Sequence, residues 1–261
     1  MNPTHLLLRY GELFLKGRNR FFFERQLQDN IYRLVGRKAR RTQGRLLLDY
    51  FPEHQKIRRV FGLMSYSPAV RIGKDVETIK AAALALLPAA TKTFKVEVVR
   101  SDKSFPIKSP ELKVTIGRHI EAHSKAAFQF QNPEWTLNIE INQDGTYLFT
   151  ETVSCLGGLP VGCSGKVLVI LEDEASVLAG LLMMKRGCTV IPVGGSDITL
   201  LQRFSPHTLE SSVAEIPLGA VAVSGQNFEN NKKIPGIVLR PLIAYNEEQI
   251  KEGLEKYKRM I

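Results

Sequence analysis

The chain has 261 residues, 44% of them hydrophobic and 24% charged, which is an ordinary composition for globular domains and enough length for two or three of them. No apolar run approaches the roughly 18 residues of a membrane helix, and the N-terminus lacks the pattern of a signal peptide, so we expect a cytoplasmic protein without membrane contact. Cys155, Cys163 and Cys188 show neither metal-site spacing nor a CxxC pair, which favours packed, reduced thiols.

The formal net charge of +10 is concentrated at one end of the sequence. Residues 1–60 contain 14 lysines and arginines against 5 acids, whereas residues 61–163 contain 11 against 10 and residues 164–261 contain 11 against 11. A basic block beside two neutral ones indicates a surface for a polyanion, and nucleic acid is the usual polyanion. A well-solvated surface without a partner is the alternative that charge alone leaves open.

The first 72 residues alternate strand and helix patterns. A helix is expected after Asn19, a candidate cap, because Phe23, Leu27, Ile31 and Leu34 follow at helical spacing. A second helix is expected at 56–61, and strands at 6–9, 38–43, 45–51 and 64–72, with a turn at Gly44. The order βαββαβ is typical of a ferredoxin-like domain, which we place at residues 1–60.

The middle segment, residues 61–163, reads as an α+β domain. Helices are expected at 76–87 and from Ser109, where Ser109 is the candidate cap and Pro110 the first helical residue. Residues 94–100 predict a strand, and 135–141 with 147–153 predict a hairpin around Asp144-Gly145. The glycine-rich residues 156–162 read as a linker.

The last segment, residues 164–261, alternates strands and helices, which implies a small parallel, Rossmann-like sheet. Strands are expected at 167–171, 189–193, 219–223 and 236–240, and helices at 176–186 and from Asn246, where Gln249 would complete a capping box. The first strand, turn and helix have the arrangement that cradles phosphates. However, the turn Glu172-Asp173-Glu174-Ala175-Ser176 carries three acids and no glycine, so its chemistry opposes an anion.

Several basic residues are candidates for RNA binding because cations contact phosphates and aromatic rings stack on bases. Lys16, Arg18 and Arg20 are interleaved with phenylalanines, although Phe22 and Phe23 also fit a helix core. Arg40, Arg41 and Arg45 extend this basic face along the neighbouring strands. Arg100, Lys103 and Lys108 lie in a loop that ends at a predicted helix N-terminus, which is a favourable place for a phosphate. His119 and His123 are one helical turn apart but have no third ligand nearby, so no metal site is predicted.

Four segments in order resemble the tRNA 4-thiouridine synthetase family, also called tRNA sulfurtransferases or ThiI-like proteins. They are YGELFLKGRNR at 10–20, the Arg100–Pro110 loop with the later NPEW and LGGLPVG, the segment GKVLVIL…AGLLMMKRGCTVIPV, and AVAVSGQN…VLRPLIAYNEEQIKE. The resemblance implies a ferredoxin-like domain, a THUMP domain that grips the acceptor end of tRNA, and a PP-loop ATP pyrophosphatase domain. In the family, ATP adenylates a uridine and persulfide sulfur then replaces its oxygen. By the same resemblance Arg100, Lys103 and Arg118 match THUMP positions nearest the RNA end. A homodimer through the C-terminal domain is a separate expectation.

The chain departs from the family where the chemistry takes place. The family's SGGxDS motif is replaced by EDEAS, one residue shorter before Ala179-Gly180, its GQVASQT segment survives only as Gly225-Gln226-Asn227-Phe228, and no cysteine stands at the sulfur-relay positions. We therefore predict a vestigial nucleotide site with no catalytic residue, no metal and no cofactor, formed by Leu171, Glu172, Asp173, Ser176, Gly225 and Gln226.

Three interpretations follow from this departure. In the first, the protein binds tRNA and keeps a degenerate nucleotide domain as a scaffold or dimerisation surface. In the second, it is an active ATP- and magnesium-dependent sulfurtransferase with an atypical site. In the third, it is the recognition subunit of another RNA-modifying enzyme. Nucleotide binding distinguishes the first from the second.

Overall fold

The computed structural model describes residues 1–11, 17, 19–42, 44–194, 197–210, 217 and 219–261. Contacts divide the chain into two compact units. The first comprises residues 1–9, 40–52 and 66–153, and the second comprises 10–39, 53–65 and 154–261. No helix among the described residues is both long enough and apolar enough to cross a membrane.

Most of one mixed sheet lies in the first unit. Its strands run in the spatial order β2 (Arg40–Thr42), β3 (Arg45–Asp49), β1 (His5–Tyr10), β4 (Leu63–Ile72), β8 (Gly145–Phe149), β7 (Trp135–Asn142), β5 (Thr93–Arg100) and β6 (Ala127–Phe128). β9 (Val153–Ser154) pairs with β4 off this path. β5 is parallel to both of its neighbours, whereas β1 and β3 are antiparallel.

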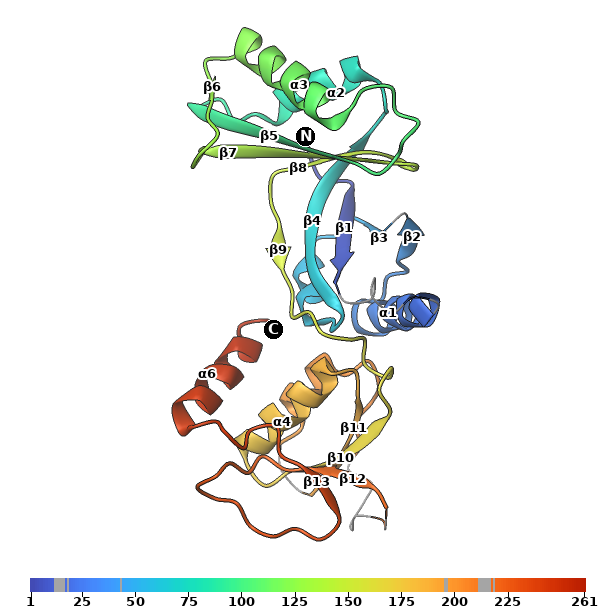
Figure 1. Cartoon of the computed structure of the whole chain (residues 1–261), viewed down its shortest axis with the longest axis vertical. Helices are drawn as coiled ribbons and strands as arrows, with labels where there is room; N and C mark the ends of the chain where they lie inside the picture. The colour runs from blue at the N-terminus through green and yellow to red at the C-terminus, as the bar shows by residue number, and fades with distance from the viewer. Residues whose placement is uncertain (12–16, 18, 43, 195–196, 211–216, 218) are drawn as a thin grey trace. The chain divides into compact units, whose positions relative to one another are not determined.

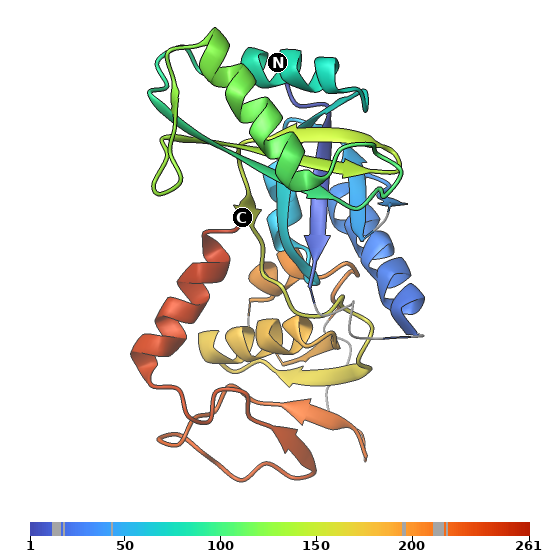
Figure 2. The same cartoon turned by 45° about the horizontal axis from the view of Figure 1, so that its top comes forward.

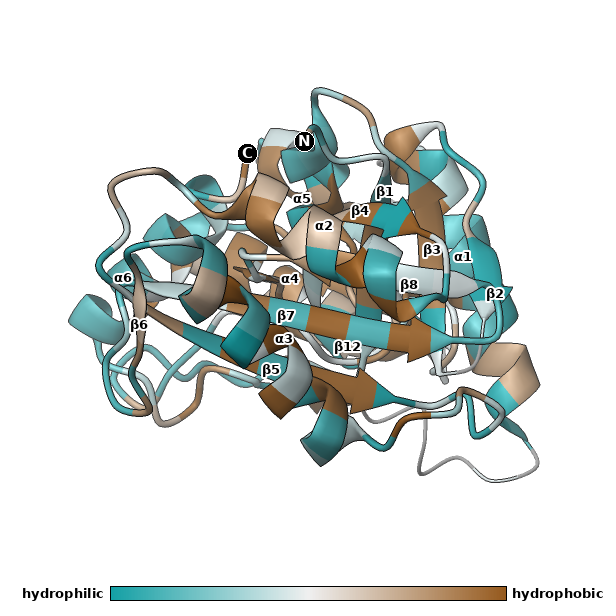
Figure 3. Ribbon diagram, turned by 90° about the horizontal axis from the view of Figure 1, so that it is seen from above, coloured by the Kyte–Doolittle hydropathy of each residue, from teal (hydrophilic) through white to brown (hydrophobic). Residues whose placement is uncertain are grey.

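Two helices, α2 (Val76–Leu86) and α3 (Ser109–His123), cover one face of β5 and β7 (Figure 1). Polar and apolar residues alternate along β7, which is the pattern of a strand with one face in the core (Figure 3). Leu112, Ile116 and Ile120 form the buried face of α3, as their spacing predicts.

Two local expectations for this unit are wrong. The cap position of α3 is Lys108, not Ser109, and its side chain makes no capping hydrogen bond. The hairpin turn is Gln143-Asp144 rather than Asp144-Gly145, because Asn142 pairs with Gly145. The Asn142 side chain explains the shift, since its Oδ1 accepts hydrogen bonds from the backbone N–H groups of both Asp144 and Gly145.

The second unit contains a parallel sheet in the order β11 (Thr189–Val193), β10 (Lys166–Ile170), β12 (Val221–Val223) and β13 (Ile237–Leu239). Its helices are α1 (Arg20–Val35), α4 (Glu174–Lys185), α5 (Thr199–Phe204) and α6 (Glu247–Lys258), together with the 3-10 helix η2 (His54–Arg59). α4 packs on β10 and against α6 (Figure 2). The core joins Val169, Leu181, Met184, Phe204 and Leu254.

The predicted elements of this unit are present, with local differences. The helix expected at 56–61 is a 3-10 helix at 54–59, and the strand expected at 219–223 is limited to 221–223. Asn19 does occupy the cap position of α1, but its side chain makes no capping hydrogen bond. The capping box of α6 is confirmed, with Asn246 and Gln249 bonded reciprocally. Cys188, expected on a strand, is buried just before β11.

Candidate nucleic-acid interface and nucleotide site

The basic residues at the start of the chain differ in their surroundings. Lys16 and Arg18 lie outside the described residues. Arg20, in the first turn of α1, donates from Nε to Glu24 Oε1 over 2.6 Å and from Nη2 to the Tyr10 hydroxyl over 3.1 Å. The Tyr10 hydroxyl donates to the same carboxylate, and burial together with this bond raises the pKa of Tyr10 to about 12. Arg20 thus neutralises the buried Glu24, which is a structural task.

The arginines of β2 and β3 also divide into two kinds. Arg40 and Arg41 are exposed, and the Arg40 guanidinium lies 3.8 Å from the Asp49 carboxylate, which is also exposed. Arg45 is different, because its Nε lies 3.0 Å from Oε1 of the buried Glu140 and only 23% of its side chain is accessible. Arg9 also approaches Glu140, at 3.9 Å. The charge of Arg45 is therefore largely compensated within the fold.

The loop between β5 and α3 is held by internal polar contacts. Asp102 accepts from Lys74 Nζ over 2.8 Å and from the Ser104 N–H and hydroxyl over 2.9 and 2.6 Å. These bonds hold the pKa of Asp102 down at about 2, with the Lys74 contact the largest cause. Arg100, predicted to contact RNA, donates from Nη1 to the carbonyls of Phe105 and Ile107 over 2.7 and 3.2 Å. Its hydrogen bonds shape the loop from within.

This internal bracing leaves other cations of the loop facing outward. Lys103 and Lys108 are exposed, and so is Arg118 farther along α3. Lys108 occupies the cap position without a side-chain hydrogen bond, so the cap residue itself bonds none of the backbone N–H groups in the first turn of α3. Exposed lysines beside an uncapped helix N-terminus make a suitable place for a phosphate, although Glu111 in the first turn opposes it.

The turn between β10 and α4 has the opposite character. Asp173 caps α4 by accepting from the Ser176 N–H over 2.9 Å, and Ser176 Oγ accepts from the N–H groups of Glu172 and Asp173, each over 3.1 Å. Three backbone donors near the start of α4, those of Glu172, Asp173 and Ser176, are therefore occupied within the turn itself. The sequence predicted the acids but not this capping box, because Ser176 at the third helical position is a less usual partner than Glu or Gln.

The other predicted members of the nucleotide site are Gly225 and Gln226. Gly225 packs against this turn, and Gln226 forms hydrogen bonds within the segment after β12. A Cβ built on Gly225 would lie 2.3 Å from Ser176 N and 2.6 Å from Ala175 C, so the loop packs directly on the start of α4. Gln226 is buried, and its Oε1 accepts from Lys232 N and Arg240 Nε, both over 3.3 Å. Leu171 is buried below the turn, in the core.

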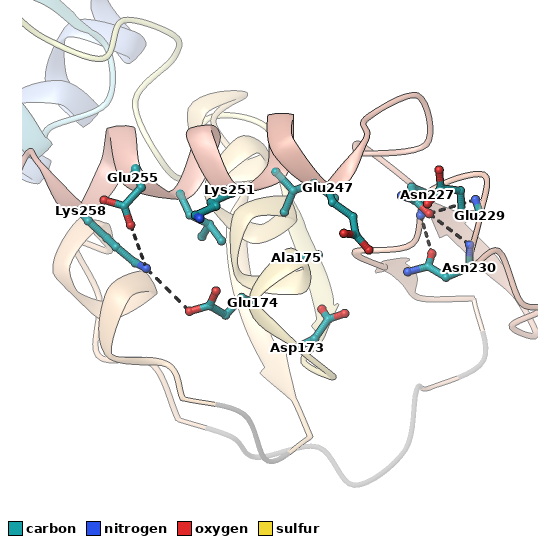
Figure 4. Close-up of a pocket in the computed structure, with 12 residues that line it drawn as sticks. Asp173, Glu174, Ala175, Asn227, Glu229, Asn230, Glu247, Lys251, Glu255 and Lys258 are labelled. Carbon is teal, nitrogen blue, oxygen red and sulfur yellow. Dashed lines mark hydrogen bonds and ion pairs between the residues drawn. The ribbon is translucent and has the colours of Figure 1, made fainter.

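A groove of about 790 Å³ opens beside this turn, between the start of α4, the face of α6 and the loop at 227–230 (Figure 4). Two lysines, Lys251 and Lys258, face five acids there: Asp173, Glu174, Glu229, Glu247 and Glu255. Lys258 lies 3.7 Å from Glu174 and 3.3 Å from Glu255, so its charge is shared between them. The groove has a net negative lining, which disfavours a polyphosphate.

No metal centre is formed by the part of the chain that the structure describes. No group of three His, Cys, Asp or Glu side chains there could hold an ion. His119 and His123 stack with ring centroids 4.3 Å apart on α3, and no third ligand joins them.

The acids that form ion pairs with the predicted cations were not identified from the sequence. Glu24 was detectable, since it follows Arg20 by four residues on a helix. Glu140 was not, because it is 95 residues from Arg45 and meets it only through the order of the strands. Lys74 is likewise brought to Asp102 by the tertiary fold.

Comparison with known families identifies two segments. The ThiI ferredoxin-like domain family matches residues 5–67, and the THUMP domain family matches residues 73–151. Two relatives carry the curated name "Probable tRNA sulfurtransferase". The one from Brevibacillus brevis is 40% identical over 204 residues, covering 73% of this chain and 51% of that protein. The one from Oceanobacillus iheyensis is 40% identical over 200 residues, covering 72% and 50%. The chain therefore spans about half the length of the curated relatives it matches.

Solved structures share the whole fold. PH1313 from Pyrococcus horikoshii OT3 superposes with a TM-score of 0.83 at 29% identity, covering 99% of this chain and 100% of that one. A 4-thiouridine synthetase, solved as an RNA complex with bound ATP, superposes with a TM-score of 0.77 at 23% identity, covering 99% and 85%. The second likeness is one of fold. With its ferredoxin-like and THUMP domains in this order, the chain belongs to the ThiI, or tRNA sulfurtransferase, family.

Proposed function

We propose that this protein binds tRNA at its acceptor end through the ferredoxin-like and THUMP segments. The observation that carries the proposal is the THUMP match at 73–151, which contains the exposed Lys103, Lys108 and Arg118 and the uncapped start of α3. The basic block at 1–60 supports it, and Arg40 and Arg41 are among its exposed described members. Lys16, Arg18, Arg20, Arg45 and Arg100 stay predicted RNA contacts, although the last three are already engaged within the fold.

Salt-dependent tRNA binding tests this proposal. Fluorescence anisotropy with labelled tRNA should show an affinity that falls with salt, because each phosphate contact releases counterions and contributes about 0.9 to the slope of log K against log salt. The double variant Arg40→Glu/Arg41→Glu should bind at least about tenfold more weakly. Lys232→Glu/Lys233→Glu is the matched control, since it reverses the same number of exposed charges in the C-terminal segment.

The acceptor end is tested separately by removing the 3′-terminal nucleotides of the tRNA. The wild type should prefer the intact end, and Lys103→Ala should lose that preference. Equal binding of intact and truncated tRNA by the wild type would contradict the acceptor-end mode. A salt-independent affinity would contradict tRNA binding altogether.

We further propose that the C-terminal segment does not activate ATP. The turn at 172–176 offers three acids, its N–H groups at Glu172, Asp173 and Ser176 are bonded to side chains of the turn, and the neighbouring groove is acidic. These features do not fit a triphosphate, for which backbone N–H groups at a helix N-terminus are the usual partners. Magnesium bridging Glu172 or Asp173 to the phosphates is the route by which the alternative, an active sulfurtransferase, could work.

Pyrophosphate release distinguishes these two alternatives. We expect none when the protein is incubated with ATP, magnesium and tRNA, and no heat of binding when ATP and magnesium are titrated with or without tRNA. Formation of adenylated tRNA would establish the active sulfurtransferase instead. The same proposal includes a division into three domains, at 1–60, 61–163 and 164–261. It also includes a cytoplasmic location and a homodimer formed through the last domain. Sedimentation of a version lacking residues 164–261 tests the dimer.

A further inference from the structure

A buried arginine without a counterion lies at the end of η2. Arg59 is the last residue of this 3-10 helix and is only 9% exposed, between the buried Ile57, Val60 and Phe61. Its Nε has no hydrogen-bond partner, and no carboxylate in the described part of the chain is paired with it. Guanidinium groups stay charged at neutral pH, and a buried unpaired charge is costly. Such a group in a native fold favours an anionic partner, and the described residues provide none.

A second guanidinium, that of Arg203, is near enough to act electrostatically on Arg59. Arg203 belongs to the last turn of α5 and is exposed. Three aromatic rings bring the two elements together. The Phe61 and Phe204 ring centroids lie 5.9 Å apart, and Tyr257 contacts both rings, at 6.2 and 5.4 Å. Burial and the proximity of Arg203 lower the pKa of Arg59, whereas burial raises the pKa of Tyr257 to about 12. The phenol therefore stays neutral and supplies no compensating charge.

We propose that Arg59 and Arg203 form an anion site that takes a phosphate group. Two like charges repel, and a phosphate between them would turn that repulsion into two charge-assisted contacts. Phosphate suits this pair because it carries several acceptor oxygens and up to two negative charges, and the planar fork of arginine can bond two such oxygens at once. The exposed Arg203 keeps the site open to solvent, while Arg59 supplies a fixed, partly desolvated charge.

The phosphate could be a group of an RNA backbone or free inorganic phosphate, and two measurements separate these sources. The first is thermal unfolding of the full chain in sodium phosphate against sodium chloride of equal ionic strength. Phosphate at ten times its dissociation constant should raise Tm by about 3–6 °C beyond the general salt effect. Arg203→Gln should lose most of this rise. In chloride the same variant should melt no lower than the wild type, because removing Arg203 relieves the repulsion on Arg59.

Lys233→Gln is the matched control, because it removes one exposed positive charge away from this site and should keep the full phosphate response. Arg59→Gln provides a second test at the buried position. If the wild type and Arg203→Gln respond equally to phosphate, the proposed site does not exist. This measurement does not depend on the proposed tRNA binding.

The second measurement is tRNA affinity of Arg203→Gln. If the site holds an RNA phosphate, the slope of log K against log salt should fall by about 0.9 and the affinity should drop severalfold. An unchanged tRNA affinity, together with a lost phosphate response, assigns the site to the free ion. Failure of the wild type to bind tRNA at all would overturn the proposed function and leave the phosphate result standing.

Discussion

Two strand–loop–helix segments of this chain have the same outline and opposite chemistry. Between β5 and α3, an aspartate is used inside the loop, lysines face outward, and no side chain caps the helix. Between β10 and α4, acids face outward and the aspartate caps the helix. A helix N-terminus is thus available to an anion only if the local side chains leave its N–H groups uncapped. The comparison indicates that α3, and not α4, retains the features of a phosphate site.

The largest expected effect concerns the packing that closes the α4 turn. Gly225→Ala should destabilise the protein by about 3 kcal/mol or more, because the new Cβ would lie 2.3 Å from backbone Ser176 N, where no flexible side chain can yield. Urea unfolding measures the change. The contrasting control is Gly117→Ala in α3, where a Cβ meets no atom within 4 Å. It should stabilise by about 0.5–1 kcal/mol through helix propensity. A mild cost at Gly225 would show that the loop is not held against α4.

The next effect tests the open character of the α3 turn. Lys103→Glu/Lys108→Glu should weaken tRNA binding by about tenfold or more, because it places two like charges beside the helix N-terminus where a phosphate would bind. Anisotropy titrations at two salt concentrations should also show a shallower salt dependence. The matched variant Lys251→Glu/Lys258→Glu reverses two charges beside the α4 turn and should leave tRNA affinity nearly unchanged. Similar losses in both variants would remove the distinction between the two turns.

A smaller effect is expected from the cap of α4. Asp173→Ala should destabilise the protein by about 1 kcal/mol, since it leaves the Ser176 N–H without its acceptor. Conversely, Lys108→Asn should stabilise α3 by a similar or smaller amount by supplying the side-chain cap that this helix lacks. Chemical unfolding of both variants measures the pair. Opposite signs are expected, and equal signs would contradict the difference in capping.

The smallest effect is a pH dependence confined to the α3 loop. In the folded protein the pKa of Asp102 is lowered from 3.8 to about 2. The contribution of this carboxylate to folding stability is therefore fully present above about pH 4 and is lost as the pH falls towards 2. Thermal unfolding of the wild type between pH 5 and 2.5 should therefore show a steeper loss of Tm than that of Asp102→Asn. Asp173→Asn is the comparison at the α4 turn. Parallel wild-type and Asp102→Asn curves would show that the Lys74 contact does not hold the loop.

Much of the fold follows from the order of the residues. The alternation along Trp135–Asn142, the spacing of Leu112, Ile116 and Ile120, and the Asn246–Gln249 capping box all predict their elements, because each depends on neighbours within a few positions. The hairpin turn and the α3 cap were misplaced by one residue. In the hairpin, the Asn142 side chain bonds the two N–H groups that follow and competes with the preference of the Asp-Gly pair.

The sequence by itself determined the basic block, the acids of the 172–176 turn and the identity of the ferredoxin-like and THUMP segments, since these lie in composition and in short ordered motifs. Only the tertiary structure decided which cations are available. It pairs Arg45 with Glu140 and directs Arg100 to loop carbonyls, and among the described residues it leaves Arg59 buried without a carboxylate. The physical reason is that the state of a charge depends on what lies within a few ångströms of it. Strand order and helix packing bring those neighbours together from distant parts of the chain.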